Sequence, residues 1–218
     1  MVIFDCNGVL VDSESIASAV LSRALASIGI KAPPQDLARR FHGRRPSDVF
    51  HAIEQATGRR LPKDFAERVG DETLRRMRSE LRPIPHVDRA LTWIRGPKAV
   101  ASSSPLERIQ ASLELTGLLG FFSGRLFSAS RVNRGKPAPD LFLHAAAQMQ
   151  IQPSKCIVVE DSVPGITAAT AAGMTPIAFV GGSDAAGHLA GDLSRAGARA
   201  IIADMRHLHG TITNLRGW

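Results

Sequence analysis

Tyrosine is absent from the 218 residues of this chain, and cysteine and tryptophan occur only twice each. Two cysteines, Cys6 and Cys156, are too few for a disulfide framework, and their apolar neighbours predict buried free thiols. No apolar run approaches the roughly 18 residues of a membrane-spanning helix. Because no basic leader precedes an apolar stretch at the N-terminus, we expect no signal peptide and a cytoplasmic protein.

A formal charge of +7 and a pI near 10.4 raise the question of a nucleic-acid partner. The basic residues are dispersed along the chain, however, and aromatic residues, which could stack on bases, make up only 5% of it. We therefore expect neither nucleic acid nor membrane among its partners. The basic surface is either simply solvated or attracts a small phosphorylated substrate.

Short apolar segments alternate with helical ones along most of the chain. The first expected strand is Met1–Phe4, and further strands are predicted at 98–101, 125–128, 156–160, 176–180 and 199–202. Helices are predicted between them at 105–116, 138–149 and 164–172. Because short apolar strands that alternate with helices form parallel sheets, we predict an α/β fold with a doubly wound, mostly parallel sheet.

A different pattern follows the first strand. Apolar residues recur at helical spacing from 14 to 28, and the segments 46–57 and 64–80 have the same period. Gly29 and the Pro33–Pro34 pair end the first of these helices. The sequence therefore predicts a core domain of residues 1–13 and 84–218 and an inserted helical domain of residues 14–83.

Side chains that can carry chemistry stand where expected strands end. Asp5 follows the first strand, Ser102 follows another, and Glu160 and Asp161 follow a third. Ligands of α/β proteins bind at the carboxyl ends of the strands, so Asp5 is a candidate nucleophile or metal ligand. The adjacent carboxylates suit Mg²⁺, which prefers oxygen ligands. Ser102 also precedes an expected helix, whose N-terminal amides can bind an anion.

These residues occur in four segments, which read in order FDCNGVLVDSE, VASSSP, GKPAPDLF and IVVEDSVPGI. The segments resemble the ordered motifs of the haloacid dehalogenase superfamily, in particular its phosphatases and β-phosphoglucomutase-like members with a small helical cap. The resemblance covers essentially the whole chain. It implies a Mg²⁺-dependent phosphomonoester hydrolase acting on a small phosphorylated metabolite, for example a sugar phosphate. It also identifies the helical insertion as a cap over the site, and a helical subdomain without closure is the alternative.

The resemblance assigns roles to individual residues. Asp5 would attack phosphorus and form an aspartyl-phosphate, and Glu160 would be either a second metal ligand or an orienting group. The implied catalytic residues are Asp5, Asn7, Ser102 and Lys136. The implied substrate-binding residues are Ser102, Ser103, Lys136, Gly43, Arg44 and Arg45. The implied metal ligands are Asp5, Asn7 through its backbone carbonyl, Glu160 and Asp161.

Asn7 departs from the family pattern, which has an aspartate at this position as general acid and base. A side-chain amide can act as neither general acid nor general base near neutral pH. Losing general acid–base catalysis typically costs about 10² to 10⁴ in rate. Three explanations stay open: an engineered trap, a naturally slow or repurposed enzyme, or another group that supplies the proton. The alternative function is therefore an impaired phosphoester-binding protein.

The segment FHGRRPSDVF places Gly43, Arg44 and Arg45 in a loop between cap helices. In the family, a corresponding glycine-containing loop reaches toward the active site, so either arginine could bind a sugar hydroxyl or a second phosphate. Related phosphoglucomutases carry a cap histidine where this chain has Ala17. A phosphomutase is therefore only the third hypothesis. As a separate expectation, the protein is a monomer or a weak dimer.

Overall fold

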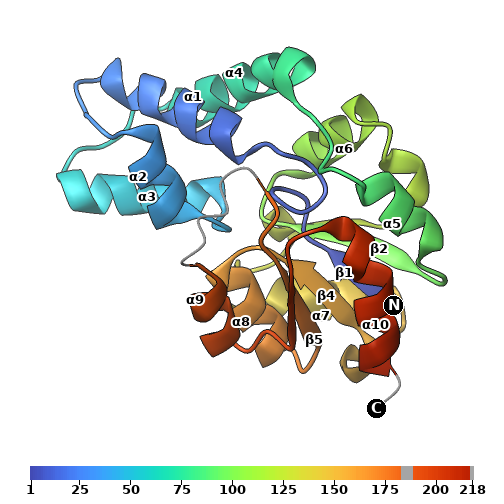
Figure 1. Ribbon diagram of the computed structural model, residues 1–218. Helices are drawn as coiled ribbons and strands as arrows, with labels where there is room; N and C mark the ends of the chain where they lie inside the picture. Colours follow the sequence, from blue (N-terminus) through green and yellow to red (C-terminus); the bar gives the residue numbers. More distant parts are fainter. Residues whose placement is uncertain (183–188, 217–218) are drawn as a thin grey trace.

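The computed structural model describes residues 1–182 and 189–216. Its centre is a six-stranded parallel sheet in the order β3-β2-β1-β4-β5-β6 (Figure 1). The strands are β1 (Val2–Phe4), β2 (Lys98–Ser102), β3 (Leu126–Ser128), β4 (Ile157–Glu160), β5 (Thr175–Phe179) and β6 (Ala200–Ile202). The predicted α/β fold with a doubly wound sheet is confirmed, and every predicted strand end lies within one residue of the observed one.

Helices cover both faces of this sheet, and a further group stands beside it. The helices are α1 (Glu14–Ala26), α2 (Pro34–Phe41), α3 (Pro46–Thr57), α4 (Phe65–Glu80), α5 (Val87–Trp93), α6 (Leu106–Leu115), α7 (Asp140–Gln148), α8 (Val163–Ala171), α9 (Leu189–Arg195) and α10 (Leu208–Arg216). In the sequence, Pro33–Pro34 indicates only an interruption between helices. The structure starts α2 at Pro34, because proline fits the first turn of a helix, where no intrahelical partner is lost.

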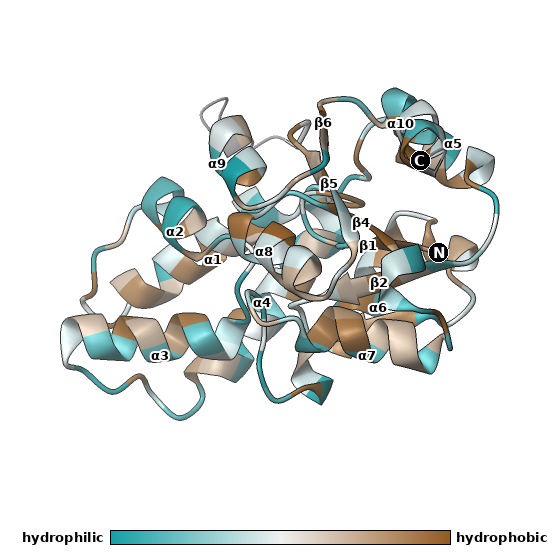
Figure 2. Cartoon of the chain, turned by 90° about the horizontal axis from the view of Figure 1, so that it is seen from below, coloured by the Kyte–Doolittle hydropathy of each residue, from teal (hydrophilic) through white to brown (hydrophobic). Residues whose placement is uncertain are grey.

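Alternate residues of each strand pack on opposite faces of the sheet. Phe4 and Val100 belong to an apolar cluster with α5, α6 and α10, whereas Ile3 and Ala101 belong to a second cluster with α7 and α8. Figure 2 shows mostly hydrophobic residues along α7 and α8. Because both faces are covered, the middle positions of the strands are apolar without alternation, and the polar residues stand at strand ends: Lys98, Ser102, Ser128, Glu160 and Thr175.

Helices α1 to α4 lie together at one side of the sheet (Figure 1). They share an apolar cluster of their own, whose buried members are Leu21, Leu25, Leu37, Val49, Ile53 and Phe65. Near the two chain crossings, Ile16 of α1 and Met77 of α4 pack instead into the cluster of the sheet. The helical group therefore has its own small core, and two of its helices also pack against the core of the sheet. The domain boundaries given above stay a prediction.

This arrangement puts the ends of three neighbouring strands beneath the helical group. In the sheet β2, β1 and β4 are adjacent, so Ser102, Asp5 and Glu160 meet at one edge although they are far apart in sequence. The carboxyl edge of a doubly wound sheet is where ligands bind. Among the described helices, none is long and apolar enough to cross a membrane.

Candidate active site

Asp5 is the first residue beyond β1 and is almost fully buried. Its backbone N–H donates to the Val159 carbonyl at 2.9 Å, which continues the β1–β4 pairing by one residue. The chain then turns at Gly8, where φ is 72°. A Cβ at Gly8 would lie 1.7 Å from Oδ2 of Asp161, so only glycine allows the loop to approach this carboxylate so closely.

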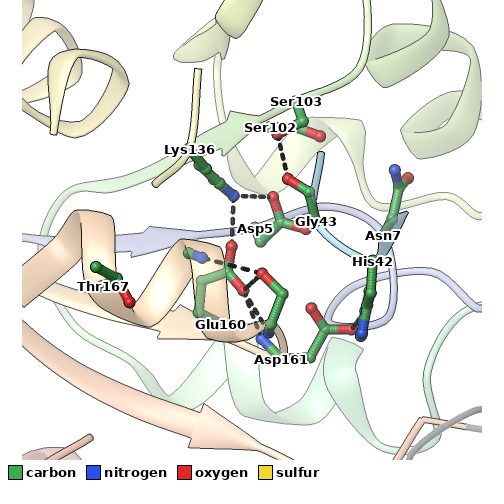
Figure 3. Close-up of polar contacts among 12 residues, drawn as sticks. Asp5, Asn7, His42, Gly43, Ser102, Ser103, Lys136, Glu160, Asp161 and Thr167 are labelled. Carbon is green, nitrogen blue, oxygen red and sulfur yellow. Dashed lines mark hydrogen bonds and ion pairs between the residues drawn. The ribbon is translucent and has the colours of Figure 1, made fainter. Parts of the chain in front are cut away.

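Lys136 joins two carboxylates at the centre of the site (Figure 3). Its Nζ donates to Oδ1 of Asp5 at 2.6 Å and to Oε1 of Glu160 at 2.5 Å, and its side chain is fully buried. Burial alone would lower the pKa of Lys136, but the two carboxylates together raise it above its usual range. Burial raises the pKa of Asp5 to about 7, against the lowering effect of the Lys136 charge.

Glu160 is held by hydrogen bonds on both carboxylate oxygens. Its Oε2 accepts from the backbone N–H of Asp161 at 2.8 Å and from the N–H and hydroxyl of Ser162 at 2.7 and 2.9 Å. Burial opposes ionisation, yet Lys136 and Ser162 hold the pKa of Glu160 below its usual value. A Cβ at Gly165 would lie 1.8 Å from Oε1, so the first turn of α8 packs directly on this carboxylate. These contacts orient Glu160 rigidly.

His42 also reaches the site, and the sequence analysis did not single it out. It lies at the end of α2, and its Nε2 is 3.0 Å from Oδ2 of Asp161. Burial raises the pKa of Asp161 to about 6, and the charge of Asp161 raises the pKa of His42 to about 10. The one available signal was its position, directly before Gly43 in the loop expected to approach the site.

A metal site fits the acidic residues. Asp5, Glu160 and Asp161 each offer a carboxylate oxygen, and these atoms lie within 4.8 Å of one another. An all-oxygen set suits a hard cation such as Mg²⁺, which uses one or two carboxylates together with water and phosphate oxygens. Because the oxygens of Glu160 already accept several hydrogen bonds, Asp5 and Asp161 are the better placed ligands.

The three serines after β2 connect the sheet edge to the helical group. Ser102 is fully buried and its Oγ accepts from the backbone N–H of Ser104 at 3.2 Å. Ser103 donates its hydroxyl hydrogen to the Gly43 carbonyl at 2.8 Å. At Gly43 φ is 75°, and a Cβ there would lie 2.2 Å from the hydroxyl of Ser162. Glycine therefore lets the loop between α2 and α3 rest on the site residues.

Asn7 lies at the same edge. Its Nδ2 donates to the Ser104 hydroxyl at 3.0 Å, while its buried Oδ1 has no hydrogen-bond partner among the described residues. The amide is thus held in place by a serine rather than by a charged group. An unpaired buried acceptor is costly, so a donor from a bound ligand would stabilise it.

The two arginines predicted to bind substrate are placed differently. Arg44 is exposed and lines the pocket. Arg45 does not line it: its guanidinium pairs with Asp48 at 2.9 Å and donates to the carbonyls of Ala129 and Val132 at 3.5 and 3.4 Å. Arg45 therefore ties the start of α3 to the core in this conformation.

A pocket of about 110 Å³ lies between the sheet edge and helices α1 to α4. Residues from both sides line it, including Asp5, Asn7, Ser102, Ser103, His42, Gly43, Arg44 and Asp161. Lys136 and Glu160 do not line the pocket. Lys136 contacts Asp5, which does line it, and Glu160 contacts Lys136. A pocket lined both by the sheet edge and by the helices above it suits a small molecule rather than a polymer.

Three comparisons bear on this site. A family model described as haloacid dehalogenase-like hydrolase matches residues 1–173. The chain is 35% identical over 179 residues to 6-phosphogluconate phosphatase from Escherichia coli, covering 82% of this chain and 81% of that protein. It is 32% identical over 177 residues to fructose-1-phosphate phosphatase from the same organism, covering 80% and 93% of the two chains.

Among solved structures, the fold is similar to a haloacid dehalogenase-like protein from Agrobacterium tumefaciens. The TM-score is 0.83 with 35% sequence identity, over 99% of this chain and 98% of the other. The similarity therefore extends over the sheet and the helical group together.

Proposed function

Because this chain belongs to the haloacid dehalogenase-like hydrolase family, we propose that it hydrolyses phosphate monoesters of small sugars or sugar acids in a Mg²⁺-dependent reaction. The observation that carries the proposal is the buried group of Asp5, Lys136 and Glu160 beside Asp161, at the carboxyl edge of the sheet. The substrate class follows from the relatives, whose names specify 6-phosphogluconate and fructose 1-phosphate.

In the proposed mechanism Asp5 is the nucleophile. Lys136 occupies Oδ1 of this carboxylate and leaves the other oxygen to attack phosphorus. The bond from phosphorus to the sugar oxygen breaks, an aspartyl-phosphate forms on Asp5, and water then hydrolyses it. Ser102 and the backbone amides before α6 would bind the phosphate oxygens. Lys136 favours the ionised form of Asp5, against the effect of burial, and holds the carboxylate in position.

Mg²⁺ held by Asp5, Asp161 and the backbone carbonyl of Asn7 would supply positive charge that offsets the negative charge of the transferring phosphate. Glu160 then acts through Lys136 and the Ser162 segment, which it orients by hydrogen bonds. The metal requirement and these ligands are part of the proposal.

Proton transfer is the weak point of this site. The leaving sugar oxygen needs a proton, and the attacking water must lose one, but the Asn7 amide can do neither. We expect turnover to be about 10² to 10⁴ slower than with a carboxylic acid at this position. This observation favours one second candidate, a phosphoester-binding protein with little turnover. Binding would survive because Asn7 keeps its backbone carbonyl and its Ser104 contact.

The test measures phosphate release from a panel of sugar phosphates and an aryl phosphate, with Mg²⁺ and with EDTA. It compares the native chain with Asn7→Asp and Asp5→Ala. Mg²⁺-dependent release that Asp5→Ala abolishes supports the phosphatase. Release by Asn7→Asp alone supports the binding protein. Release that persists in Asp5→Ala contradicts the assigned nucleophile.

A further inference from the structure

A second positively charged group faces the pocket, apart from the groups assigned to catalysis. Arg108 lies in the first turn of α6 and lines the same pocket as Asp5 and Asn7. Among the described residues, no hydrogen bond or ion pair involves its guanidinium, and its Nε is closed off from solvent without a partner. The residue as a whole is half-buried and forms part of the pocket wall.

This position is unfavourable for an arginine that has no ligand. A guanidinium carries five N–H donors and stays charged, and leaving such donors unpaired away from water costs free energy. Burial is the main cause that lowers the pKa of Arg108, and the charge of Glu14 acts in the opposite direction. The first turn of a helix also repels a positive charge. An anion bound in the pocket would remove these costs.

The phosphate that is hydrolysed is not the expected partner of Arg108. The charges that act most strongly on Asp5 are those of Lys136, Glu160 and Asp161. Arg108 is not one of these groups, and among the described residues it forms no hydrogen bond or ion pair with any of them. It lines the pocket together with Glu14, Ala17 and Ser18 of α1, so we expect it to face a part of the substrate other than the transferring phosphate.

We propose that Arg108 is a specificity-determining residue, which binds a second anionic group, a carboxylate or a phosphate, on the substrate. The inference rests on the proposed phosphatase function and narrows its substrate class. A planar guanidinium suits both groups because it donates two parallel hydrogen bonds to either. Exposed Arg44 also lines the pocket, but it is solvated and has no comparable need for an anion.

The experiment uses two pairs of substrates that differ mainly in the second anionic group. They are 6-phosphogluconate against glucose 6-phosphate, and fructose 1,6-bisphosphate against fructose 6-phosphate. For each, kcat/KM is measured for the native chain, Arg108→Gln and Arg108→Lys. Arg108→Gln should lower kcat/KM about 10- to 100-fold for the substrate that carries the second anionic group. For its matched partner without that group, kcat/KM should fall less than about threefold. For Arg108→Lys, kcat/KM should lie between the values of the native chain and of Arg108→Gln, since lysine keeps the charge but loses the second hydrogen bond.

Two control variants locate the effect. Arg89→Gln removes the same charge from the exposed face of α5, outside the pocket, and should leave both ratios unchanged. Arg44→Gln tests the other pocket arginine. Equal losses for both members of a pair would show a structural role and overturn the inference, as would loss of selectivity in Arg44→Gln alone. The pair that responds tells a carboxylate site from a phosphate site.

A chain that releases no phosphate from any substrate would defeat the proposed function, but not yet this inference. Calorimetric binding of the same four compounds then decides it. Tighter binding of an anionic member that Arg108→Gln removes would support the Arg108 site. Equal binding of both members by the native chain would refute it.

Discussion

Lys136→Met offers the sharpest test of how this site is held together. The native ammonium lies 2.6 Å from Asp5 and 2.5 Å from Glu160, and its side chain has no exposed surface. Methionine fills a similar volume but leaves two neighbouring buried carboxylates without a counter-charge. Breaking a buried ion pair in this way typically costs about 3–5 kcal/mol. At an m-value of about 2–3 kcal/mol per M, the urea midpoint should fall by about 1–2 M.

The loss should also depend on pH. Burial already raises the pKa of Asp5 to about 7, and without Lys136 the pKa values of Asp5 and Glu160 would rise further. A carboxyl group whose pKa is higher in the folded state stabilises the fold while protonated and loses that contribution as pH rises. The destabilisation of Lys136→Met should therefore be largest near about pH 8 and shrink toward about pH 5.5.

The assay is urea unfolding followed by circular dichroism, with EDTA present so that no divalent cation replaces the lysine. Lys98→Met is the matched control, because the sole hydrogen bond of the Lys98 ammonium within residues 1–182 and 189–216 goes to the Ile94 carbonyl. Its effect should stay below about 1 kcal/mol. Adding Glu160→Gln to Lys136→Met should recover part of the lost stability. A loss below about 1 kcal/mol, or one that is the same at both pH values, would refute this reasoning.

Three further predictions concern the candidate active site and the two buried cysteines. Gly8→Ala should abolish Mg²⁺-dependent activity and weaken Mg²⁺ binding, measured by calorimetry, because the added Cβ would lie 1.7 Å from the Asp161 carboxylate; unchanged affinity would contradict the assigned ligand. Cys6 and Cys156 should react slowly with a thiol reagent in the native state and rapidly in urea, since both are buried and burial raises their pKa values. Mg²⁺ at about 100 times its dissociation constant should stabilise the chain by about 2.7 kcal/mol in thermal unfolding, and Asp5→Ala should reduce this gain.

Several features predicted from the sequence need experiments of another kind. The cytoplasmic location, the monomeric or weakly dimeric state and the cap boundaries at residues 14–83 stay predictions. Cap closure can be followed through Arg45, whose contacts to the Ala129 and Val132 carbonyls join α3 to the core in this conformation.

The sequence determined the sheet and the chemistry at its edge. A strand buried on both faces is apolar along most of its length without alternation, and this pattern can be recognised in the sequence alone. Three motifs placed Asp5, Ser102 and Glu160 at strand ends, a fourth placed Lys136 ahead of a helix, and the resemblance supplied their roles. The strand order then brings them together, although Lys136 and Asp5 are 131 residues apart.

Tertiary structure decided which side chains meet across the pocket. His42 contacts Asp161, Arg45 turns to the core, and Arg108 faces the pocket without a partner in the part of the chain that the structure describes. No periodic pattern in the sequence predicts these arrangements. Such contacts depend on how the helical group lies over the sheet edge, which is set by packing between segments distant in sequence. Local patterns report burial and helical or extended backbone, whereas the direction of a polar side chain between two packed parts is fixed only when both are in place.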